Sequence, residues 1–162
     1  MSSATDPHVL HDGHHPTPFT ADEIRDASPD GRTLTVTTAP AGAPPSTVRI
    51  RYTEGDAAGA VQVRTPLEED GREGEATSTV VTWAALQGHA SFPVATTTRD
   101  EVDLDHELGA LHCLRYTATD GEDVDTFWFD LARPGMPVRV QSARSGSTVV
   151  VMTVVADEVL RT

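Results

Sequence analysis

The strongest constraint on this chain is a period-two alternation of apolar and polar residues in short segments bounded by turn-forming residues. In 46–53, Val48, Ile50 and Tyr52 alternate with threonine and arginine. Successive side chains of a strand point to opposite faces, so this pattern predicts strands with one buried face and one face in water. Antiparallel sheets accommodate such strands, whereas parallel sheets are covered on both faces.

Nine segments are expected to be strands. They are 32–38, 46–53, the residues around Val61 and Val63, 77–81, 99–106, 110–119, 122–130, 137–144 and 147–156. Turn chemistry separates them, as at Asp120-Gly121 and Ser145-Gly146, where hairpin turns are expected. The run 149–155 is apolar on both faces and is therefore predicted to be a central, covered strand.

Two short helices are expected beside these strands. Thr20 and Glu23 form the pattern of a capping box at the start of a helix over about 20–27. A second helix begins after Thr82, and Trp83, Leu86 and Ala90 are spaced so that they would face a core. The predicted fold is mainly β (α+β): a curved antiparallel sheet or half-barrel of about nine strands with two short helices.

The chain of 162 residues fits one domain, which we place at 19–162. Residues 1–18 contain three prolines, four histidines and few sizeable apolar groups. Because such a segment buries little surface, it is predicted to be a disordered or loosely held tail.

Charge excludes one class of partner. The chain carries 25 acidic and 12 basic residues, a net charge of −13. Binding to nucleic acid depends on clustered cations, so nucleic acid is not an expected partner. All the basic residues are arginine, which indicates the codon bias of a GC-rich bacterial genome or, alternatively, adaptation to salt.

No apolar run approaches the roughly 20 residues of a membrane helix, so no membrane span is expected. The first residues lack the basic start and apolar stretch of a secretion signal. The single cysteine excludes an internal disulfide and agrees with a reducing compartment. These features predict a cytoplasmic protein.

No motif for catalysis or a cofactor is complete. His8, His11, His14 and His15 are of a type that binds metals, but their spacing matches no closed site, so adventitious binding is the favoured interpretation. Cys113 is expected to be a buried core thiol. An enzyme using His89 or His112 would need positioned partners that the sequence does not exhibit. We therefore expect no catalytic residues, no metal site, no cofactor and no enzymatic activity.

Large apolar side chains gather in 126–140. Phe127 and Phe129 would face opposite to Trp128, so both surfaces of the sheet carry aromatics there. One surface would pack in the core, and the other either packs or lines a cavity. The candidate ligand-binding residues are Trp83, Phe127, Trp128 and Met136.

The same region carries a resemblance. Leu108-Gly109, Cys113-Leu-Arg-Tyr-Thr117, Thr126-Phe-Trp-Phe129 and Pro134-Gly-Met-Pro-Val-Arg-Val140, with Trp83-Ala-Ala-Leu-Gln-Gly-His-Ala-Ser-Phe-Pro93, resemble a group of uncharacterised bacterial proteins over about 76–156. More distantly, the strand, turn and Pro-Val-Arg strand resemble the periplasmic lipoprotein carriers and their relatives.

The carrier resemblance implies a half-barrel that holds helices in its mouth and has an apolar cavity for acyl chains. It transfers no catalytic residue, and the chain departs from the carriers because it shows no export signal or lipid-attachment cysteine near its start. This leaves two hypotheses. The concavity binds a small lipophilic molecule or a protein segment, or the protein is a structural or protein-interaction module with a filled core and no ligand. The oligomeric state is not determined by the sequence.

Overall fold

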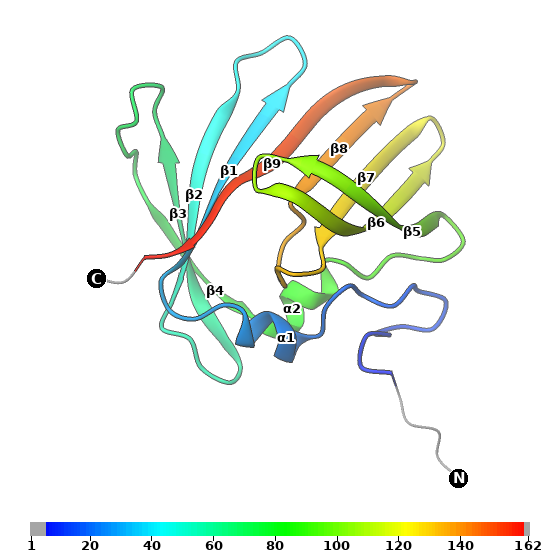
Figure 1. The fold of residues 1–162 in the computed structure, drawn as a ribbon, viewed down its shortest axis with the longest axis horizontal. Coiled ribbons are helices and arrows are strands. Elements are labelled where there is room, and N and C mark those ends of the chain that lie inside the picture. Colours follow the sequence, from blue (N-terminus) through cyan, green and yellow to red (C-terminus); the bar gives the residue numbers. More distant parts are fainter. Residues whose placement is uncertain (1–5, 161–162) are drawn as a thin grey trace.

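The computed structural model describes residues 6–160 and confirms the predicted fold class. Nine antiparallel strands form one curved sheet that does not close, in the order β4-β3-β2-β1-β9-β8-β7-β6-β5. Two short helices lie beneath the arch of this sheet (Figure 1).

The elements match the expected segments closely. The helices are α1 (Ala21–Asp26) and α2 (Trp83–Gly88). The strands are β1 (Arg32–Pro40), β2 (Ser46–Thr53), β3 (Gly59–Leu67), β4 (Thr77–Thr82), β5 (Thr97–His106), β6 (Gly109–Asp120), β7 (Asp123–Asp130), β8 (Arg139–Arg144) and β9 (Ser147–Val159).

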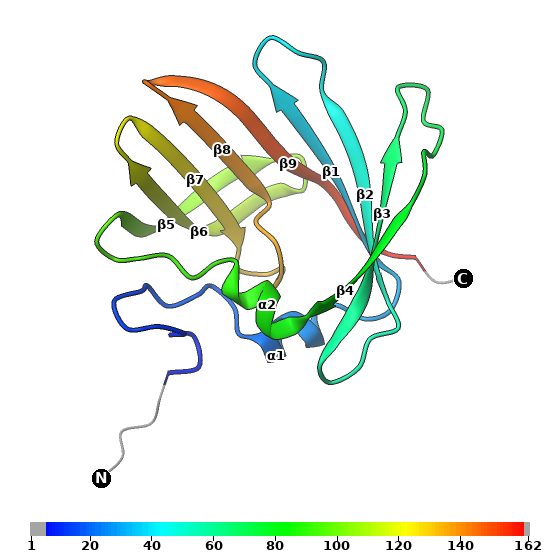
Figure 2. The same ribbon diagram turned by 180° about the vertical axis from the view of Figure 1, so that it is seen from behind.

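The sheet consists of two meanders joined at the middle. Strands β1 to β4 form one and β5 to β9 the other, and β9 returns to pair with β1. The consecutive strands β4 and β5 therefore lie at opposite edges of the sheet, and α2 is on the connection between them (Figure 2). The opening of the half-barrel is the gap that this connection crosses.

Strand β9 is central, as its apolar run predicts, because it pairs with both β1 and β8. The expectation that it is covered on both faces is wrong. Only Val154 of this strand is buried, at 2% exposure, and most of its other residues are half-buried. Both helices lie on the concave side (Figures 1 and 2), so neither of them covers the other side of β9.

Both helix starts are as expected. Thr20 Oγ1 accepts from the backbone N–H of Glu23, and the Glu23 carboxylate accepts from the backbone N–H of Thr20. Thr82 caps α2 by accepting from the N–H of Ala85. The side chains expected to face the core do so: Trp83 and Ala90 are buried and Leu86 packs against the core.

The core fills much of the concave side. It combines inward-facing residues of both meanders with residues from the helices and the segment before α1: Phe19, Ile24, Leu34, Val36, Ile50, Tyr52, Ala60, Trp83, Ala90, Leu114, Tyr116, Phe129 and Val154. Tyr116 is fully buried at its centre, with its ring 5.1 Å from Phe92 and 5.6 Å from Phe129. Cys113 is buried as expected, and burial raises the pKa of its thiol to about 11.

Residues 6–18 are attached to the body, which differs from the loosely held tail expected from composition. Thr17 is 1% exposed and accepts a hydrogen bond from the Gln87 side chain at 3.0 Å. His15 donates through Nε2 to the carbonyl of Thr97, and the carbonyl of Pro16 accepts from the Tyr116 hydroxyl. These hydrogen bonds help to hold the segment, so hydrophobic content alone is a poor guide to it. Residues 1–5 lie outside the described part.

Candidate functional site

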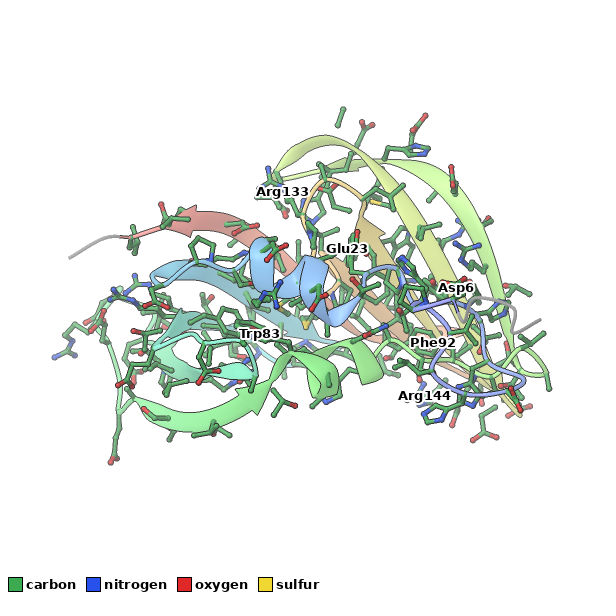
Figure 3. All side chains as sticks on the ribbon, turned by 90° about the horizontal axis from the view of Figure 1, so that it is seen from below. Asp6, Glu23, Trp83, Phe92, Arg133 and Arg144 are labelled. Carbon is green, nitrogen blue, oxygen red and sulfur yellow. The ribbon has the colours of Figure 1, made fainter. Side chains whose placement is uncertain are left out.

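A largely enclosed cavity lies where the two helices meet the concave side of the sheet. Its volume is about 180 Å³. The walls come from α1, β1, β2, α2 and the residues after it, β7 and the β7–β8 loop: Ile24, Ser28, Arg32, Leu34, Tyr52, Leu86, His89, Ala90, Phe127, Phe129, Gly135, Met136 and Pro137. Figure 3 views this region from below, with both helices across the opening.

Period-two alternation explains the apolar walls. It turns Leu34 of β1 and Tyr52 of β2 inward together with Phe127 and Phe129 of β7. Ile24, the buried residue of α1, closes the side formed by that helix. The cavity is therefore a gap between core residues of elements that lie far apart in the sequence.

Arg32, in the wall of the cavity, belongs to a buried ion pair with Asp157. The side chains of Arg32 and Asp157 are 6% and 10% exposed. The Arg32 Nε donates to Asp157 Oδ1 at 3.1 Å and its Nη2 donates to Asp157 Oδ2 at 3.0 Å, so the two side chains form a bidentate salt bridge. Its Nη1 donates to Ser28 Oγ at 3.0 Å and to the carbonyl of Pro134 at 2.6 Å.

A second arginine completes this cluster. Arg133 Nε lies 3.0 Å from Asp130 Oδ2, and its Nη1 lies 3.5 Å from Asp157 Oδ2. Two arginines thus face two aspartates, and the cluster of Arg32, Arg133, Asp130 and Asp157 is neutral. A ligand in the cavity meets no uncompensated charge from this cluster, which favours an uncharged ligand.

The β7–β8 loop is shaped to cover Arg32. Gly135 has φ +143°, a conformation that side chains with a Cβ rarely adopt. A Cβ there would lie 3.2 Å from Arg32 Nη1. Glycine therefore allows the loop to pass over the guanidinium and to bring Met136 and Pro137 to the cavity wall.

Two of the four expected ligand-binding residues line this cavity. Phe127 and Met136 are in its wall, whereas Trp83 and Trp128 are not. Trp83 is 3% exposed, packs beside Tyr52, and donates through Nε1 to the carbonyl of Asp56 at 2.8 Å. Figure 3 labels it at the start of α2.

Trp128 lies on the side of β7 opposite to Phe127 and Phe129, as alternation predicts. There the guanidinium of Arg139 lies 5.1 Å from the centre of its ring, a cation–π contact.

The rim of the cavity carries a histidine. His89 follows α2 and is exposed, next to the half-buried Leu86. The hydroxyl of Ser91, considered as a partner for His89, instead hydrogen bonds with His14 Nδ1 at 2.9 Å. Within 6–160 no hydrogen bond links the His89 ring to a carboxylate.

The remaining histidines serve contacts elsewhere. His8 donates to the carbonyl of Thr17 at 2.7 Å. His112 lies between two exposed carboxylates, with Nδ1 3.0 Å from Asp103 and Nε2 3.0 Å from Glu101. The ring N–H groups donate to these carboxylates, and the hydrogen bond to Asp103, followed by that to Glu101, raises the pKa of His112 above its usual 6.5. In the described residues no three His, Cys, Asp or Glu side chains are grouped to hold a metal ion.

Sequence reasoning missed the charged end of the cavity. Arg32 and Asp157 are 125 positions apart, and each resembles an ordinary polar residue at the end of a strand. Ser28 and Gly135 carry turn signals that say nothing about their neighbours in space. The one available signal was the Pro134-Gly-Met136 stretch, which marks a loop beside the aromatic strand.

None of the helices that the structure describes is long and apolar enough to cross a membrane. No protein-family model matches the chain, and no curated protein is significantly similar to it. The geometry of the cavity is therefore the basis for inferring function.

Proposed function

We propose that the protein binds a small, uncharged apolar molecule in the cavity between the helices and the sheet. One observation carries this: a mainly apolar cavity of about 180 Å³ whose wall arginine, Arg32, is already paired with Asp157. Ligand sites are characteristically apolar concavities with a few placed polar groups. The apolar walls and the paired charges of this site suit binding of such a molecule.

The volume limits the ligand. Binding sites for drug-sized molecules span roughly 300–1,000 Å³, and a cavity of roughly 150 Å³ lined by apolar side chains can bind benzene. The space of about 180 Å³ therefore suits one ring or a short branched chain. The long acyl chains implied by the carrier resemblance would exceed it, so the proposed ligand is smaller than a carrier's lipid.

Toluene is the probe for the first test. It should shift the NMR signal of the Met136 methyl group, which lies in the cavity wall, and raise the melting temperature. At tenfold excess over Kd the stabilisation is about 1.4 kcal/mol, or about 3–6 °C. Benzoate, of similar size but charged, should bind at least about tenfold more weakly, because Arg32 is already paired with Asp157.

A matched pair of variants locates the binding. Ala90→Leu fills the cavity and should abolish the toluene shift while the protein stays folded. Ala84→Leu makes the same change at an exposed position of α2 outside the lining and should bind toluene as the wild type does. Loss of binding in both variants, or no toluene effect on the folded wild type, would leave the alternative of a filled core without ligand.

A further inference from the structure

Strand β4 forms one edge of the sheet and has an unusual composition for an edge. Its sequence, TSTVVT, has no charged residue and no proline, and five of its six residues are β-branched. Val80 is 78% exposed, more than any other large apolar side chain of the described part. Within 6–160 β4 pairs only with β3, so the backbone groups of its other side have no strand partner there.

The opposite edge is protected in the ordinary way. Five of the ten residues of β5 are charged: Arg99, Asp100, Glu101, Asp103 and Asp105. Charged side chains on an edge strand discourage a further strand from pairing with it. The β5 edge is thus protected by charged residues, whereas the β4 edge is open, that is, free of such charges and of a strand partner in the described part. The open edge of β4 can act as a template for strand addition.

A hollow lies at the end of β4, beside Val80, Val81 and Thr82. Glu54 and Asp56 also line it. The backbone N–H groups of Gly59 and then Ala58 donate to the Asp56 carboxylate and lower its pKa, so it is charged at neutral pH. This end of the strand is therefore negative.

The beginning of β4 is negative as well. The loop 68–75 that leads into it holds five acidic residues and one arginine, Arg72, which is paired with Asp70 at 2.7 Å. Glu73 is paired with Arg49 of β2 at 2.6 Å, so an excess of three acidic residues remains. Strand β4 is thus a neutral, β-branched segment between two acidic ends. A complementary strand would be neutral at its centre and basic at both ends.

We propose that the open edge of β4 binds an extended segment of a partner protein, with β-branched residues at its centre and basic residues at both ends, as an added strand. A second copy of this chain is disfavoured as the occupant. In a two-fold antiparallel pair, the acidic loop before β4 of one copy would approach the hollow with Glu54 and Asp56 of the other. Like charges would then face each other at both ends.

The test uses a fluorescent synthetic peptide of alternating threonine and valine with arginines at both ends. The wild type should bind it at least about tenfold more tightly than the same peptide methylated on alternate backbone nitrogens, which keeps the charge but removes ladder hydrogen bonds. A peptide with glutamates in place of the arginines should also bind at least about tenfold more weakly. Amide hydrogen exchange of β4 should slow when the parent peptide is bound.

Two variants with the same charge change locate the interaction. Val80→Lys should weaken binding at least about tenfold, whereas Val94→Lys, at a 53% exposed position outside the sheet, should not. Equal binding of the methylated peptide, or unchanged binding to Val80→Lys, would overturn the proposal by showing general attraction of cations to an acidic protein. A wild-type dimer that Val80→Lys dissociates would overturn it in favour of a second copy.

Discussion

Two charged clusters of this protein have similar hydrogen-bond distances and very different surroundings. Arg32 and Asp157, beneath the β7–β8 loop, are 6% and 10% exposed. His112, Glu101 and Asp103, on the β5–β6 hairpin, are 54%, 60% and 93% exposed. In both clusters the paired nitrogen and oxygen atoms are about 3 Å apart. The two clusters therefore differ in the free-energy cost of removing one partner.

Burial decides that cost. In the first cluster water cannot replace a missing partner, so each charge depends on the other. In the second, water solvates each group and salt screens the attraction. The buried cluster therefore holds the β7–β8 loop against the cavity. The contribution of the exposed cluster to the free energy of unfolding changes with pH.

The largest expected effect comes from breaking the buried pair. Arg32→Ala should lower the free energy of unfolding by about 3–5 kcal/mol, because Asp157 is left buried with only Arg133 near it. Arg115→Ala is the exposed control, since Arg115 also pairs with an aspartate, Asp100, and should cost about 0–1 kcal/mol. Urea unfolding measures both.

A double substitution sharpens that result. Arg32→Met with Asp157→Leu removes both charges and should recover much of the stability lost by Arg32→Ala. A double variant as unstable as the single one would show that packing, and not the unpaired charge, accounts for the loss.

The two tryptophans extend the same comparison to uncharged groups. Trp83→Ala removes a side chain that is 3% exposed and should cost about 3–5 kcal/mol. Trp128→Ala removes a half-buried ring and its contact with Arg139, and should cost about 1–2 kcal/mol. Equal losses in urea unfolding would contradict the assignment of Trp128 to the solvent-facing side of β7.

Removing residues 1–18 tests the attached segment. The deletion leaves the Gln87 side chain without its partners at Pro7 and Thr17. It should lower stability by about 2 kcal/mol, or the melting temperature by about 4–8 °C. A calorimetric melting temperature equal to that of the full chain would instead support the prediction that this segment is a loosely held tail.

The smallest effect concerns pH. The pKa of His112 is raised in the folded protein, so its contribution to stability is present below the unfolded value of 6.5 and is lost as pH rises through the folded value. Between about pH 6 and about pH 8 the wild type should lose slightly more stability than His112→Gln. NMR titration of the ring gives its pKa directly, and a value at or below the ordinary one would contradict the arrangement.

Local physics made most of the fold predictable. Alternation in β2 and capping by Thr20 and Thr82 depend on residues within a few positions, so the presence and approximate position of the strands and helices can be derived from the sequence. Alternation also placed Phe127 and Trp128 on opposite sides of β7. Alternation does not reveal which side lines a cavity. For this reason the four residues were equal candidates in the sequence, although only Phe127 and Met136 line the cavity and Trp83 and Trp128 do not.

The sequence by itself determined that this chain forms a curved antiparallel sheet with two short helices, because periodicity and turn chemistry act between near neighbours. Tertiary structure decided that β9 returns to β1, so that Arg32 meets Asp157 across 125 positions and the segment 6–18 docks on Tyr116 and Gln87. Such contacts depend on how the sheet curves and on which polar groups lose access to water. Those conditions exist only in the folded protein.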